Sequence, residues 1–288
     1  MNALVQLLLV AALAPLAHGA MKALRARFSG RPGPSILQSY RDYAKLWCKE
    51  AVLPEGASII TRCAPGVAFG VALTLAAALP LGGSVPPLPD VVGLIFLLAV
   101  GHFVLGVAAL DTRSAFSGMA ASRSMTFASL VEPALLAALL GAAALGKGTQ
   151  LSSLLTLAHG PTSALAFAGF FLVMLAETAR IPIDNQETHY ELTMIHEGLV
   201  LEYSGWHLAF LQAAAQIRQL SFLLLGAILL SGGGVLALAG WAVVLAAAVS
   251  VVETVFAKVR LFEVPQLLAT GLIFAVTSIV LRLFGAPA

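Results

Sequence analysis

The stretch VVGLIFLLAVGHFVLGVAAL, residues 91–110, contains no Asp, Glu, Lys or Arg. An α-helix rises about 1.5 Å per residue, so about 20 apolar residues cross the roughly 30 Å hydrocarbon core of a lipid bilayer. These residues therefore predict a transmembrane helix. Comparable apolar stretches recur along the chain, so this stretch indicates the fold class as well as one helix.

The composition of the chain indicates the solvent in which it folds. Of 288 residues, 59% are hydrophobic and 10% are charged, and the mean hydropathy is +0.94. A water-soluble globular protein needs a more polar surface than this composition supplies. We predict an all-α, polytopic integral membrane protein that forms a single membrane domain over residues 1–288. About eight transmembrane helices are expected, near residues 2–21, 64–81, 91–110, 125–145, 161–177, 207–231, 235–256 and 265–284.

The first span argues against a signal peptide, and the cysteines argue against a bound metal. The basic residues Lys22, Arg25 and Arg27 follow the first span instead of preceding it, which favours a retained helix over a signal peptide. Cys48 and Cys63 show no Cys-x-x-Cys or Cys/His spacing, so they indicate neither an iron–sulfur cluster nor a structural zinc ion. We expect this chain to bind no metal, no cofactor and no nucleic acid.

The distribution of basic residues predicts the orientation. If the loops at 22–63, 111–124, 178–206 and 257–264 share one side of the membrane, that side holds 14 of the 16 Lys and Arg residues, counting Arg218 just inside its helix. Because loops rich in Lys and Arg tend to stay in the cytoplasm, this side is predicted to be cytoplasmic. An even number of spans then places both termini outside.

Residues 35–52 predict a cytoplasmic amphipathic helix. In SILQSYRDYAKLWCKEAV, apolar and aromatic residues recur at helical spacing, while most charged residues fall on other faces. Such a helix lies along the membrane surface or under a partner protein. The preceding segment RARFSGRPGPS, residues 25–35, is basic and interrupted by Gly and Pro, which predicts an irregular connection. A plain positive-inside anchor is the alternative interpretation of its charge.

Acidic residues are concentrated between Ala176 and Gly205, which includes the predicted cytoplasmic loop 178–206. The stretch holds six of the 14 carboxylates: Glu177, Asp184, Glu187, Glu191, Glu197 and Glu202. Three of these are at the end of an apolar span or among Leu, Ile and Val residues, which favours buried carboxylates with a function over a solvated loop without one. Glu187 and Glu191 are four residues apart, so on a helix they would repel one another, and one would hold a proton if both were buried.

Two further carboxylates lie inside apolar spans: Glu132 in SLVEPALL and Glu253 in SVVETVFAK. A charged side chain at mid-bilayer costs about 2.5 to 3.5 kcal/mol on insertion scales, so such residues usually face a polar interior or a partner. Pro133 follows Glu132 and frees a backbone carbonyl one turn earlier, which makes the helix locally polar. Pairing of Glu253 with the nearby Lys258 or Arg260 is an alternative that needs no function.

Four segments together resemble one protein family: AETARIPIDN (176–185), ELTMIHEGLVLEYSG (191–205), GRPGPSILQSYRDYAKLWCKE (30–50) and LDTRSAFSGMAASRSMTFASLVEPALL (110–136). The family is the membrane-anchor subunit shared by energy-converting NiFe-hydrogenases and by respiratory complex I, where it is subunit 1. The version IDNQETHYELTMIHE, residues 183–197, is similar to the branch of formate hydrogenlyase subunit 4 and hydrogenase 4 component C. Complex I proteins instead carry Phe before the aspartate, where Ile183 stands here, and an acidic EGESEL run.

The resemblance implies a membrane subunit without a catalytic centre of its own. Such a subunit docks a peripheral arm that carries iron–sulfur clusters and links its redox chemistry to proton translocation. The implied partners are hydrogenase large and small subunits with a NiFe centre, an iron–sulfur protein, antiporter-like membrane subunits and the lipid bilayer of the bacterial cytoplasmic (inner) membrane. Mapped by motif, the proton-coupling residues are Glu132, Glu177, Arg180, Asp184, Glu191 and Glu202. We add Glu197, which has a weaker counterpart in complex I, and Glu253, which lies inside an apolar span. The arm-docking residues are expected in the basic loop and the amphipathic helix: Arg27, Arg31, Arg41 and Lys45.

Two local interactions are expected within this set. Arg180 lies three residues after Glu177 and is expected to hold it ionised, and Asp184 is expected to cap the turn after Pro182. Two other functions are alternatives: a quinone-site subunit of an NADH:quinone oxidoreductase, and a stand-alone ion transporter. Many secondary transporters contain inverted repeats, and no internal repeat stands out in this sequence.

Overall fold

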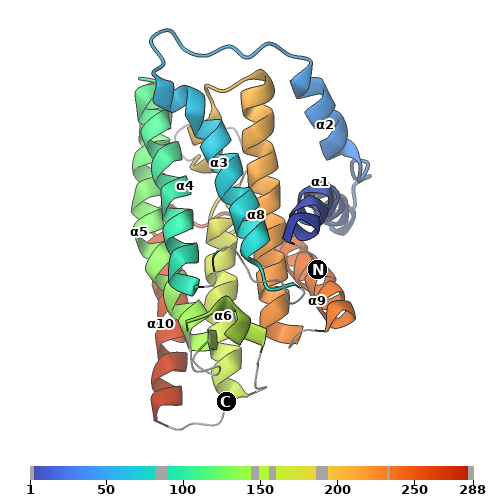
Figure 1. The fold of residues 1–288 in the computed structure, drawn as a ribbon, viewed down its shortest axis with the longest axis vertical. Helices are drawn as coiled ribbons and strands as arrows, with labels where there is room; N and C mark the ends of the chain where they lie inside the picture. Colours follow the sequence, from blue (N-terminus) through green and yellow to red (C-terminus); the bar gives the residue numbers. More distant parts are fainter. Residues whose placement is uncertain are drawn as a thin grey trace.

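The fold is a bundle of α-helices, shown in Figure 1. A computed structural model of the chain describes residues 3–81, 88, 90–143, 149–155, 160–185, 194–231 and 234–284. Within these residues, seven helices are long and apolar enough to span a membrane, and an eighth apolar helix, α6, has 17 residues. The predicted all-α, polytopic fold class is therefore confirmed. The helices are α1 (Ala3–Phe28), α2 (Gln38–Trp47), α3 (Ile59–Ala78), α4 (Val91–Asp111), α5 (Ala115–Ala143), α6 (Pro161–Glu177), α7 (His196–Val200), α8 (Gly205–Ser231), α9 (Val235–Val255) and α10 (Val264–Leu283).

Each predicted span coincides with a helix, but three helices extend beyond the apolar stretch that predicted them. α1 continues past Lys22 to Phe28. α3 begins at Ile59, where the side chain of Ser58 caps the helix, and α5 begins at Ala115 among small polar residues. Hydropathy detects the lipid-facing length, whereas a helix continues into water as long as its terminal backbone groups find partners. The predicted spans are therefore too short at these polar ends.

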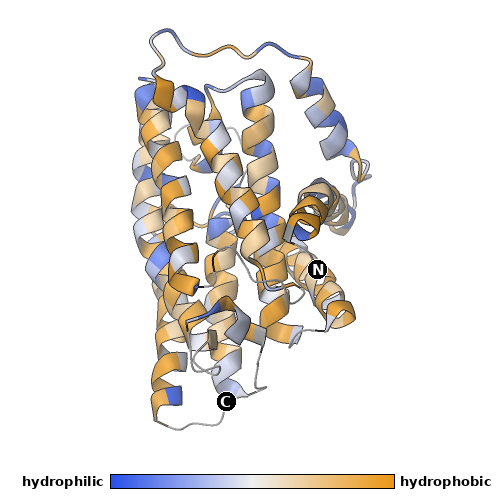
Figure 2. Cartoon of the chain, in the orientation of Figure 1, coloured by the Kyte–Doolittle hydropathy of each residue, from blue (hydrophilic) through white to orange (hydrophobic). Residues whose placement is uncertain are grey.

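Helix α8 forms the centre of the bundle. Its most apolar window is 72% buried, against 17% for the corresponding window of α9. Figure 1 shows α8 upright, with α3 and α9 beside it and α1 crossing it at a steep angle. Figure 2 shows that the outer faces of the helices are largely apolar, and large side chains such as Phe96, Val243 and Ile273 are exposed there. This surface fits contact with lipid tails.

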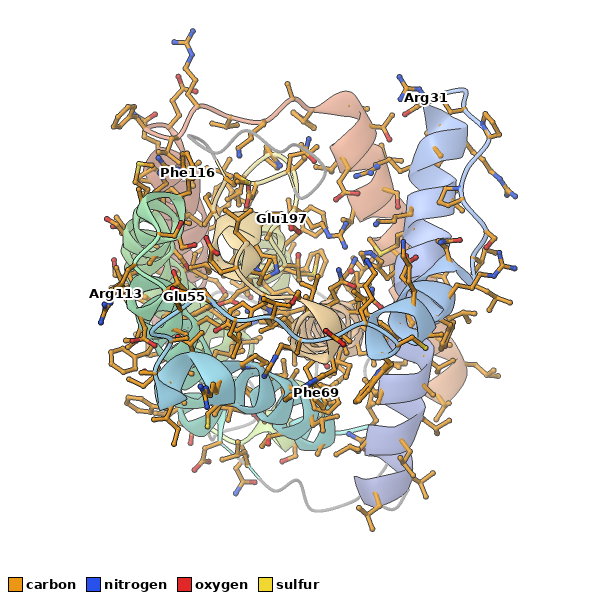
Figure 3. All side chains as sticks on the ribbon, turned by 90° about the horizontal axis from the view of Figure 1, so that it is seen from above. Arg31, Glu55, Phe69, Arg113, Phe116 and Glu197 are labelled. Atoms are coloured by element: carbon orange, nitrogen blue, oxygen red, sulfur yellow. The ribbon has the colours of Figure 1, made fainter. Side chains whose placement is uncertain are left out.

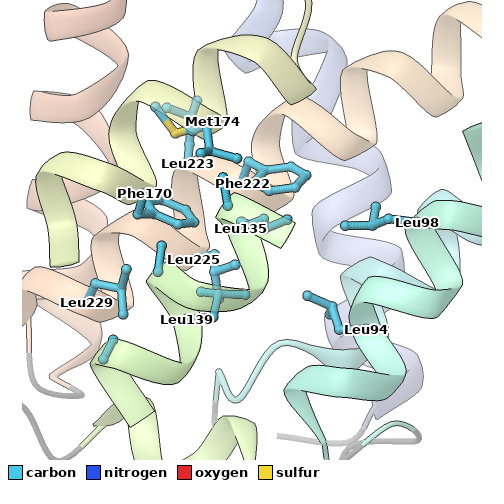
Figure 4. Close-up of a cluster of buried hydrophobic side chains, with 14 of the residues drawn as sticks. Leu94, Leu98, Leu135, Leu139, Phe170, Met174, Phe222, Leu223, Leu225 and Leu229 are labelled. Atoms are coloured by element: carbon cyan, nitrogen blue, oxygen red, sulfur yellow. The ribbon is translucent and has the colours of Figure 1, made fainter. Parts of the chain in front are cut away.

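The interior between α5, α6 and α8 is packed with Leu and aromatic side chains, drawn in Figure 4. Phe170 and Phe222 stack with ring centroids 6.3 Å apart, and Leu135 is fully buried beside them. On the other side of α6, α10 approaches very closely, because a Cβ atom at Gly169 would lie 2.8 Å from the carbonyl oxygen of Gly271. Small residues at such crossings allow membrane helices to pack backbone against backbone.

Hydrogen bonds sort the connections into two ends of the bundle. At one end, Ser58 N, before α3, donates to Asp111 Oδ2 at the end of α4 (2.9 Å). Tyr203 OH, between α7 and α8, donates to Thr61 O near the start of α3 (3.0 Å). Val259 N, after α9, donates to Pro182 O, after α6 (2.8 Å). At the other end, Asp90 pairs with Gln150 through an isolated β-bridge, and Arg282 binds the last carbonyl groups of α5. The loops rich in basic residues thus share one end.

Helix α2 lies against α1 and α8 and connects α1 to α3. It covers residues 38–47 of the predicted amphipathic helix 35–52. Tyr43 points inward, where its hydroxyl donates to Gln216 Oε1 of α8 (2.5 Å), while Arg41 and Lys45 are exposed. Burial raises the pKa of Tyr43, which keeps its hydroxyl protonated as a donor. The amphipathic character predicted from sequence therefore corresponds to one packed face and one charged outer face.

Candidate functional site

Charged and titratable side chains gather around two cavities toward the basic end of the bundle. The first, of about 160 Å³, lies between α1, α2, α8, α9 and the segment after α6, and we call it the Arg180 cavity. The second, of about 60 Å³, lies between α4, α5, α6 and α8, and we call it the Glu177 cavity. Asp184 and His196 line both. Both cavities are roomy enough for ordered water molecules.

The end of α6 directs two charged residues in different directions. α6 ends at Glu177, and Ala179 has a φ of 50°, a left-handed conformation that reverses the chain. Glu177 therefore stays on the helix and faces the cavity that bears its name. Arg180 comes after the reversal and faces the Arg180 cavity.

Arg180 is a buried charge with several partners. One guanidinium nitrogen donates to Glu253 Oε1 (3.1 Å). The other donates to Gln219 Oε1 (2.5 Å) and lies 3.1 Å from His18 Nδ1. Glu253 Oε2 also lies 3.6 Å from Arg25 at the end of α1. A buried ion is costly unless paired and hydrogen-bonded, so this group of α1, α8 and α9 residues holds Arg180 in one place.

The expected pairing of Arg180 with Glu177 is wrong. That expectation assumed helical spacing through both residues, but α6 stops at Glu177 and the chain reverses before Arg180. Arg180 binds Glu253 instead, a residue 73 positions away in sequence. Local spacing could not reveal this partner.

The alternative pairing of Glu253 with Lys258 or Arg260 is also wrong. Lys258 Nζ donates to Asp184 Oδ1 (2.8 Å). α9 ends at Val255, so Lys258 lies beyond the helix and reaches the segment after α6. Glu253 remains within α9, two residues before its end, where its side chain is 3% exposed and lies near two arginines.

Asp184 fastens the segment after α6 to its neighbours. Its Oδ1 atom accepts from the backbone N–H of Asn185 (2.9 Å), and its Oδ2 atom accepts from the backbone N–H of His196 (3.0 Å). The predicted cap on the turn after Pro182 stays a prediction, because the carboxylate binds the next residue and a residue 12 positions away. Val259 N donates to Pro182 O (2.8 Å) in the same place. The carboxylate thus joins the segment after α6 to the start of α7.

Glu177 lines the Glu177 cavity and makes no hydrogen bond to the described residues. Its side chain is fully buried, and neither carboxylate oxygen has a hydrogen-bond partner among the described residues. The nearest titratable atom is Nε2 of His102 on α4, 3.5 Å away. Arg218 of α8 lines the same cavity. A buried carboxylate without a donor is costly, so ordered water or a mobile proton is the natural partner for it here.

Glu132 lies beside the Glu177 cavity, on α5. Its Oε1 atom is 3.4 Å from Nδ1 of His102, and its side chain is 24% exposed. Pro133, the next residue, is exposed on the outer face of α5. Glu132 therefore faces His102 on one side and the outer surface of the bundle on the other.

The other predicted carboxylates are placed differently. Glu197 lines the Arg180 cavity, and Figure 3, seen from above relative to Figure 1, shows it near the middle of the molecule. Glu202 is half-buried in the turn between α7 and α8 and lines neither cavity. Glu187 and Glu191 lie outside the described residues, so their expected repulsion is not tested.

The predicted arm-docking residues lie on the surface. Arg27, Arg31, Arg41 and Lys45 are all exposed, at the end of α1, in the connection after it and on α2. Figure 3 shows Arg31 at the rim of the molecule, away from the centre. None of the four lines the Arg180 cavity or the Glu177 cavity.

Sequence reasoning missed the polar residues inside the spans. These residues are His102, His18, Gln219 and Arg218, which line the cavities or bind residues that do; His102 and His18 are single polar residues in apolar stretches, and Arg218 and Gln219 are adjacent on α8. An available signal was that polar residues in a span usually face a cavity or one another. His196 was seen in a motif but given no role. Burial, followed by the positive charge of Arg218, lowers its pKa to about 4, which keeps the ring neutral between the two cavities.

Among the residues that the structure describes, no three His, Cys, Asp or Glu side chains come together as a candidate metal site. Cys48 and Cys63 are both free and exposed. What the cavities can do is hold, exchange and pass protons, because they combine carboxylates, neutral imidazoles, fixed positive charges and space for water.

Comparison with known proteins identifies the family. Residues 1–283 match the family described as NADH dehydrogenase. The chain is 36% identical to formate hydrogenlyase subunit 4 of Escherichia coli (strain K12), over 75% of this chain and 73% of that protein. It is 37% identical to hydrogenase-4 component C of the same organism, over 75% and 70%. It is 31% identical to an NADH-quinone oxidoreductase subunit of Thermomicrobium roseum (strain ATCC 27502 / DSM 5159 / P-2), over 72% and 70%.

A solved structure shares the fold. The match is to a chain of the membrane-bound sulfane sulfur reductase, an archaeal respiratory membrane complex, with a TM-score of 0.79. The two chains are 18% identical, and the match covers 96% of this chain and 98% of the other. At this identity the likeness concerns the arrangement of helices alone.

Proposed function

The chain belongs to the NADH dehydrogenase family, and from this premise we propose that it is the membrane-anchoring and proton-coupling subunit of an energy-converting NiFe-hydrogenase of the formate hydrogenlyase type. The coarser part of this statement, a membrane subunit of a complex I-like complex, follows from its relatives. The finer part rests on which relatives are most similar and on the geometry of the cavities.

The branch within the family is supported by sequence identity. The two hydrogenase-type relatives are 36% and 37% identical to the chain, against 31% for the NADH-quinone oxidoreductase relative from Thermomicrobium roseum. We propose that the iron–sulfur clusters and the NiFe centre belong to partner subunits, and that antiporter-like subunits extend the membrane arm. In this proposal the chain has no catalytic centre of its own and lies in the bacterial cytoplasmic membrane with both termini outside.

A succession of titratable groups carries the proposal of proton coupling. It begins at the Arg180 cavity and continues through His196, which also lines the Glu177 cavity. There Glu177 lies 3.5 Å from His102, and His102 lies 3.4 Å from Glu132. Buried ionisable groups in transmembrane segments are costly, so a connected series of them is expected to serve a proton path.

The coupling has a simple electrostatic basis. We place the redox centres of the peripheral arm against the basic end of the bundle, where the exposed residues Arg27, Arg31, Arg41 and Lys45 form the docking surface. Reduction of a centre there adds negative charge beside the Arg180 cavity. The added charge favours proton uptake by the nearest buried groups, and oxidation reverses the effect. The arrangement of Arg180, Glu253 and Asp184 is fixed by hydrogen bonds, so the charge acts on groups held in place.

A quinone-site subunit is the second candidate. The Arg180 cavity, of about 160 Å³, favours it because the cavity lies beside α2 and is lined by His18, Arg180 and Glu253. The higher identity to the hydrogenase-type relatives favours the first candidate.

Co-purification tests the proposed function. An affinity-tagged chain extracted from native membranes in mild detergent is expected to bring with it a hydrogenase large subunit with nickel, iron–sulfur proteins and antiporter-like subunits. The purified complex should evolve hydrogen from a reduced viologen dye. The variants Arg31→Glu and Arg41→Glu are expected to release the soluble arm while the membrane subunits stay together, because they reverse charges on the docking surface.

The outcomes separate the candidates. A complex that lacks nickel and reduces a quinone analogue would support the second candidate and contradict the first. A chain that purifies alone and is active in ion transport would contradict both. The variant Glu55→Gln in the exposed connection before α3 is the matched control, and its complex should be intact.

A further inference from the structure

His102 lies between the buried carboxylate of Glu177 and the half-buried carboxylate of Glu132, with a different ring nitrogen facing each. Nδ1 is 3.4 Å from Glu132 Oε1, and Nε2 is 3.5 Å from Glu177 Oε2. Nε2 is also 3.5 Å from a guanidinium nitrogen of Arg218. The ring therefore has a partner for either nitrogen, whether that nitrogen donates or accepts. In a neutral histidine, the hydrogen bond that one ring nitrogen makes usually decides which nitrogen carries the proton.

Each neutral tautomer of the ring directs its N–H toward one of the two carboxylates. With the proton on Nδ1, the ring donates to Glu132, and Nε2 accepts from Arg218. With the proton on Nε2, the N–H faces Glu177 Oε2 at 3.5 Å, and Nδ1 accepts from a protonated Glu132 at 3.4 Å. A ring with a carboxylate beside each nitrogen is suited to receive a proton on one nitrogen and release one from the other.

We propose that His102 is the proton-transfer residue that joins Glu177 to Glu132, with Arg218 as the positioning residue that returns it to the starting tautomer. This inference rests on the proposed function and names the group through which the two carboxylates communicate. The carboxylates are 45 positions apart in sequence and on different helices, and His102 has a ring nitrogen within 3.5 Å of each.

The transfer is balanced in protons. Protonated Glu177 gives its proton to Nε2 while the proton on Nδ1 passes to Glu132, so that one O–H and one N–H bond break and one N–H and one O–H bond form. The ring is then in the Nε2–H tautomer. It returns to the Nδ1–H tautomer by rotation or by exchange through water in the Glu177 cavity, and the donor Arg218 favours an unprotonated Nε2. No electron moves and no co-reactant is needed.

Arg218 also explains why the transfer has a direction. Its positive charge lies on the Glu177 side of the ring. A ring with a proton on each nitrogen is an imidazolium, which the positive charge of Arg218 disfavours, so the proton on Nδ1, the nitrogen farther from Arg218, leaves toward Glu132. Glu132 is 24% exposed at the outer face of α5 and is placed to hand the proton on.

The test uses the assembled complex in proteoliposomes, driven by a reduced viologen dye, with a pH-sensitive dye enclosed in the vesicles. The variants are His102→Gln, His102→Ala, Glu177→Gln and Glu132→Gln. Phe103→Leu is the matched control, because Phe103 follows His102 on α4 and is exposed on the outer face. Assembled complex is quantified in each sample. Neutral imidazole is added to the His102→Ala sample, where it can enter the space left by the ring.

We expect His102→Gln and His102→Ala to lower redox-driven proton translocation about a hundredfold, the lower end of the effect of a positioned proton-transfer group. Imidazole should restore it in His102→Ala and leave Glu177→Gln unchanged. A purely structural role would not be restored by free imidazole, so absence of rescue in an assembled His102→Ala complex would overturn the inference.

The design distinguishes failure of this inference from failure of the proposed function. If Glu177→Gln and Glu132→Gln lose translocation while both His102 variants keep it, the carboxylates act through another route and His102 is not the link. If Glu177→Gln and Glu132→Gln translocate protons like the parent, the proposed function itself fails, and the inference fails with it.

Discussion

At the scale of single residues, His196 forms the boundary between the two cavities. Its backbone N–H donates to Asp184 Oδ2 (3.0 Å), and its ring lines both the Arg180 cavity and the Glu177 cavity. Burial and the charge of Arg218 lower its pKa to about 4, against the opposing attraction of Asp184. The folded chain therefore holds this ring neutral at a pH where an unfolded histidine is partly protonated.

This depressed pKa predicts an acid-sensitive stability. His196 takes up a proton below about pH 6.5 in the unfolded state and only below about pH 4 in the folded state. The free energy of unfolding therefore falls as the pH decreases from about 6.5 to 4. The loss reaches about 3 kcal/mol at pH 4 and below. The variant His196→Gln should lose less stability than the parent between pH 6.5 and 4.

Thermal unfolding in detergent at a series of pH values measures the effect. The control Glu55→Gln, in an exposed loop, should follow the parent curve. Parallel curves for the parent and His196→Gln would show that this histidine carries no linked proton.

The sequence predicts the partner of a side chain when the two residues are close along the chain, and does not when they are far apart. The hydrogen bond from Asn185 N–H to Asp184 joins neighbours in sequence, whereas the bond from His196 N–H to the same carboxylate spans 12 positions. The Arg180–Glu253 pair spans 73 positions, and the His102–Glu132 contact spans 30 on a different helix. Such contacts depend on how helices pack, which one sequence does not state. The predictable part of the site was its composition, and the unpredictable part was its pairing.

At the scale of elements, the short helix α7 depends on its contact with α5. α7 has five residues, too few to be stable by itself. A Cβ atom at Gly198 would lie 2.4 Å from the Cβ of Ala120 on α5. The absence of a side chain at Gly198 is what lets α7 lie against α5, and it thereby sets the position of His196 at the cavity boundary.

This contact predicts that Gly198→Ala destabilises the protein by about 1 to 3 kcal/mol, the usual cost of overpacking an interior. The control is Gly118→Ala on α5, where a Cβ atom would meet nothing within 4 Å, and where Ala is favoured over Gly in a helix by about 0.5 to 1 kcal/mol. Melting temperatures in detergent compare the two. Equal stability of Gly198→Ala and the parent would mean that α7 does not depend on this close packing.

The elements themselves were largely predictable. Apolar length gave the spans, and helical spacing of aromatic and charged residues gave α2. α7 was not predicted, because five residues carry too little periodicity to be distinguished from a loop. The polar extensions of α1, α3 and α5 were missed because they do not differ in hydropathy from connections.

At the scale of the whole molecule, the distribution of charge orients the bundle in the membrane. The connections that carry most of the basic residues lie at one end, and we propose that this end faces the cytoplasm. The peripheral arm and its redox centres then lie on the same side. The Arg180 cavity opens toward that side in this proposal, which allows protons to enter from the cytoplasm.

A labelling experiment tests the orientation. In a chain with Cys48→Ser and Cys63→Ser, a cysteine at Gly234 should react with a membrane-impermeant maleimide in intact cells, and a cysteine at Glu55 should react after the membrane is opened. Both positions are exposed in the structure, so access depends on the side of the membrane. The reverse labelling pattern would contradict the proposed orientation.

The central claim is that the buried carboxylates pass protons, and Glu177 tests it most directly. Gln keeps the size and hydrogen-bonding ability of Glu while removing its titration, and Glu177 has no hydrogen bond among the described residues for the substitution to break. The measurement is redox-driven proton translocation in membrane vesicles, divided by the amount of assembled complex, for the parent, Glu177→Gln and the loop control Glu55→Gln. The account predicts an intact Glu177→Gln complex with translocation lowered about a hundredfold and an unaltered Glu55→Gln complex. Equal translocation by Glu177→Gln and the parent would contradict it.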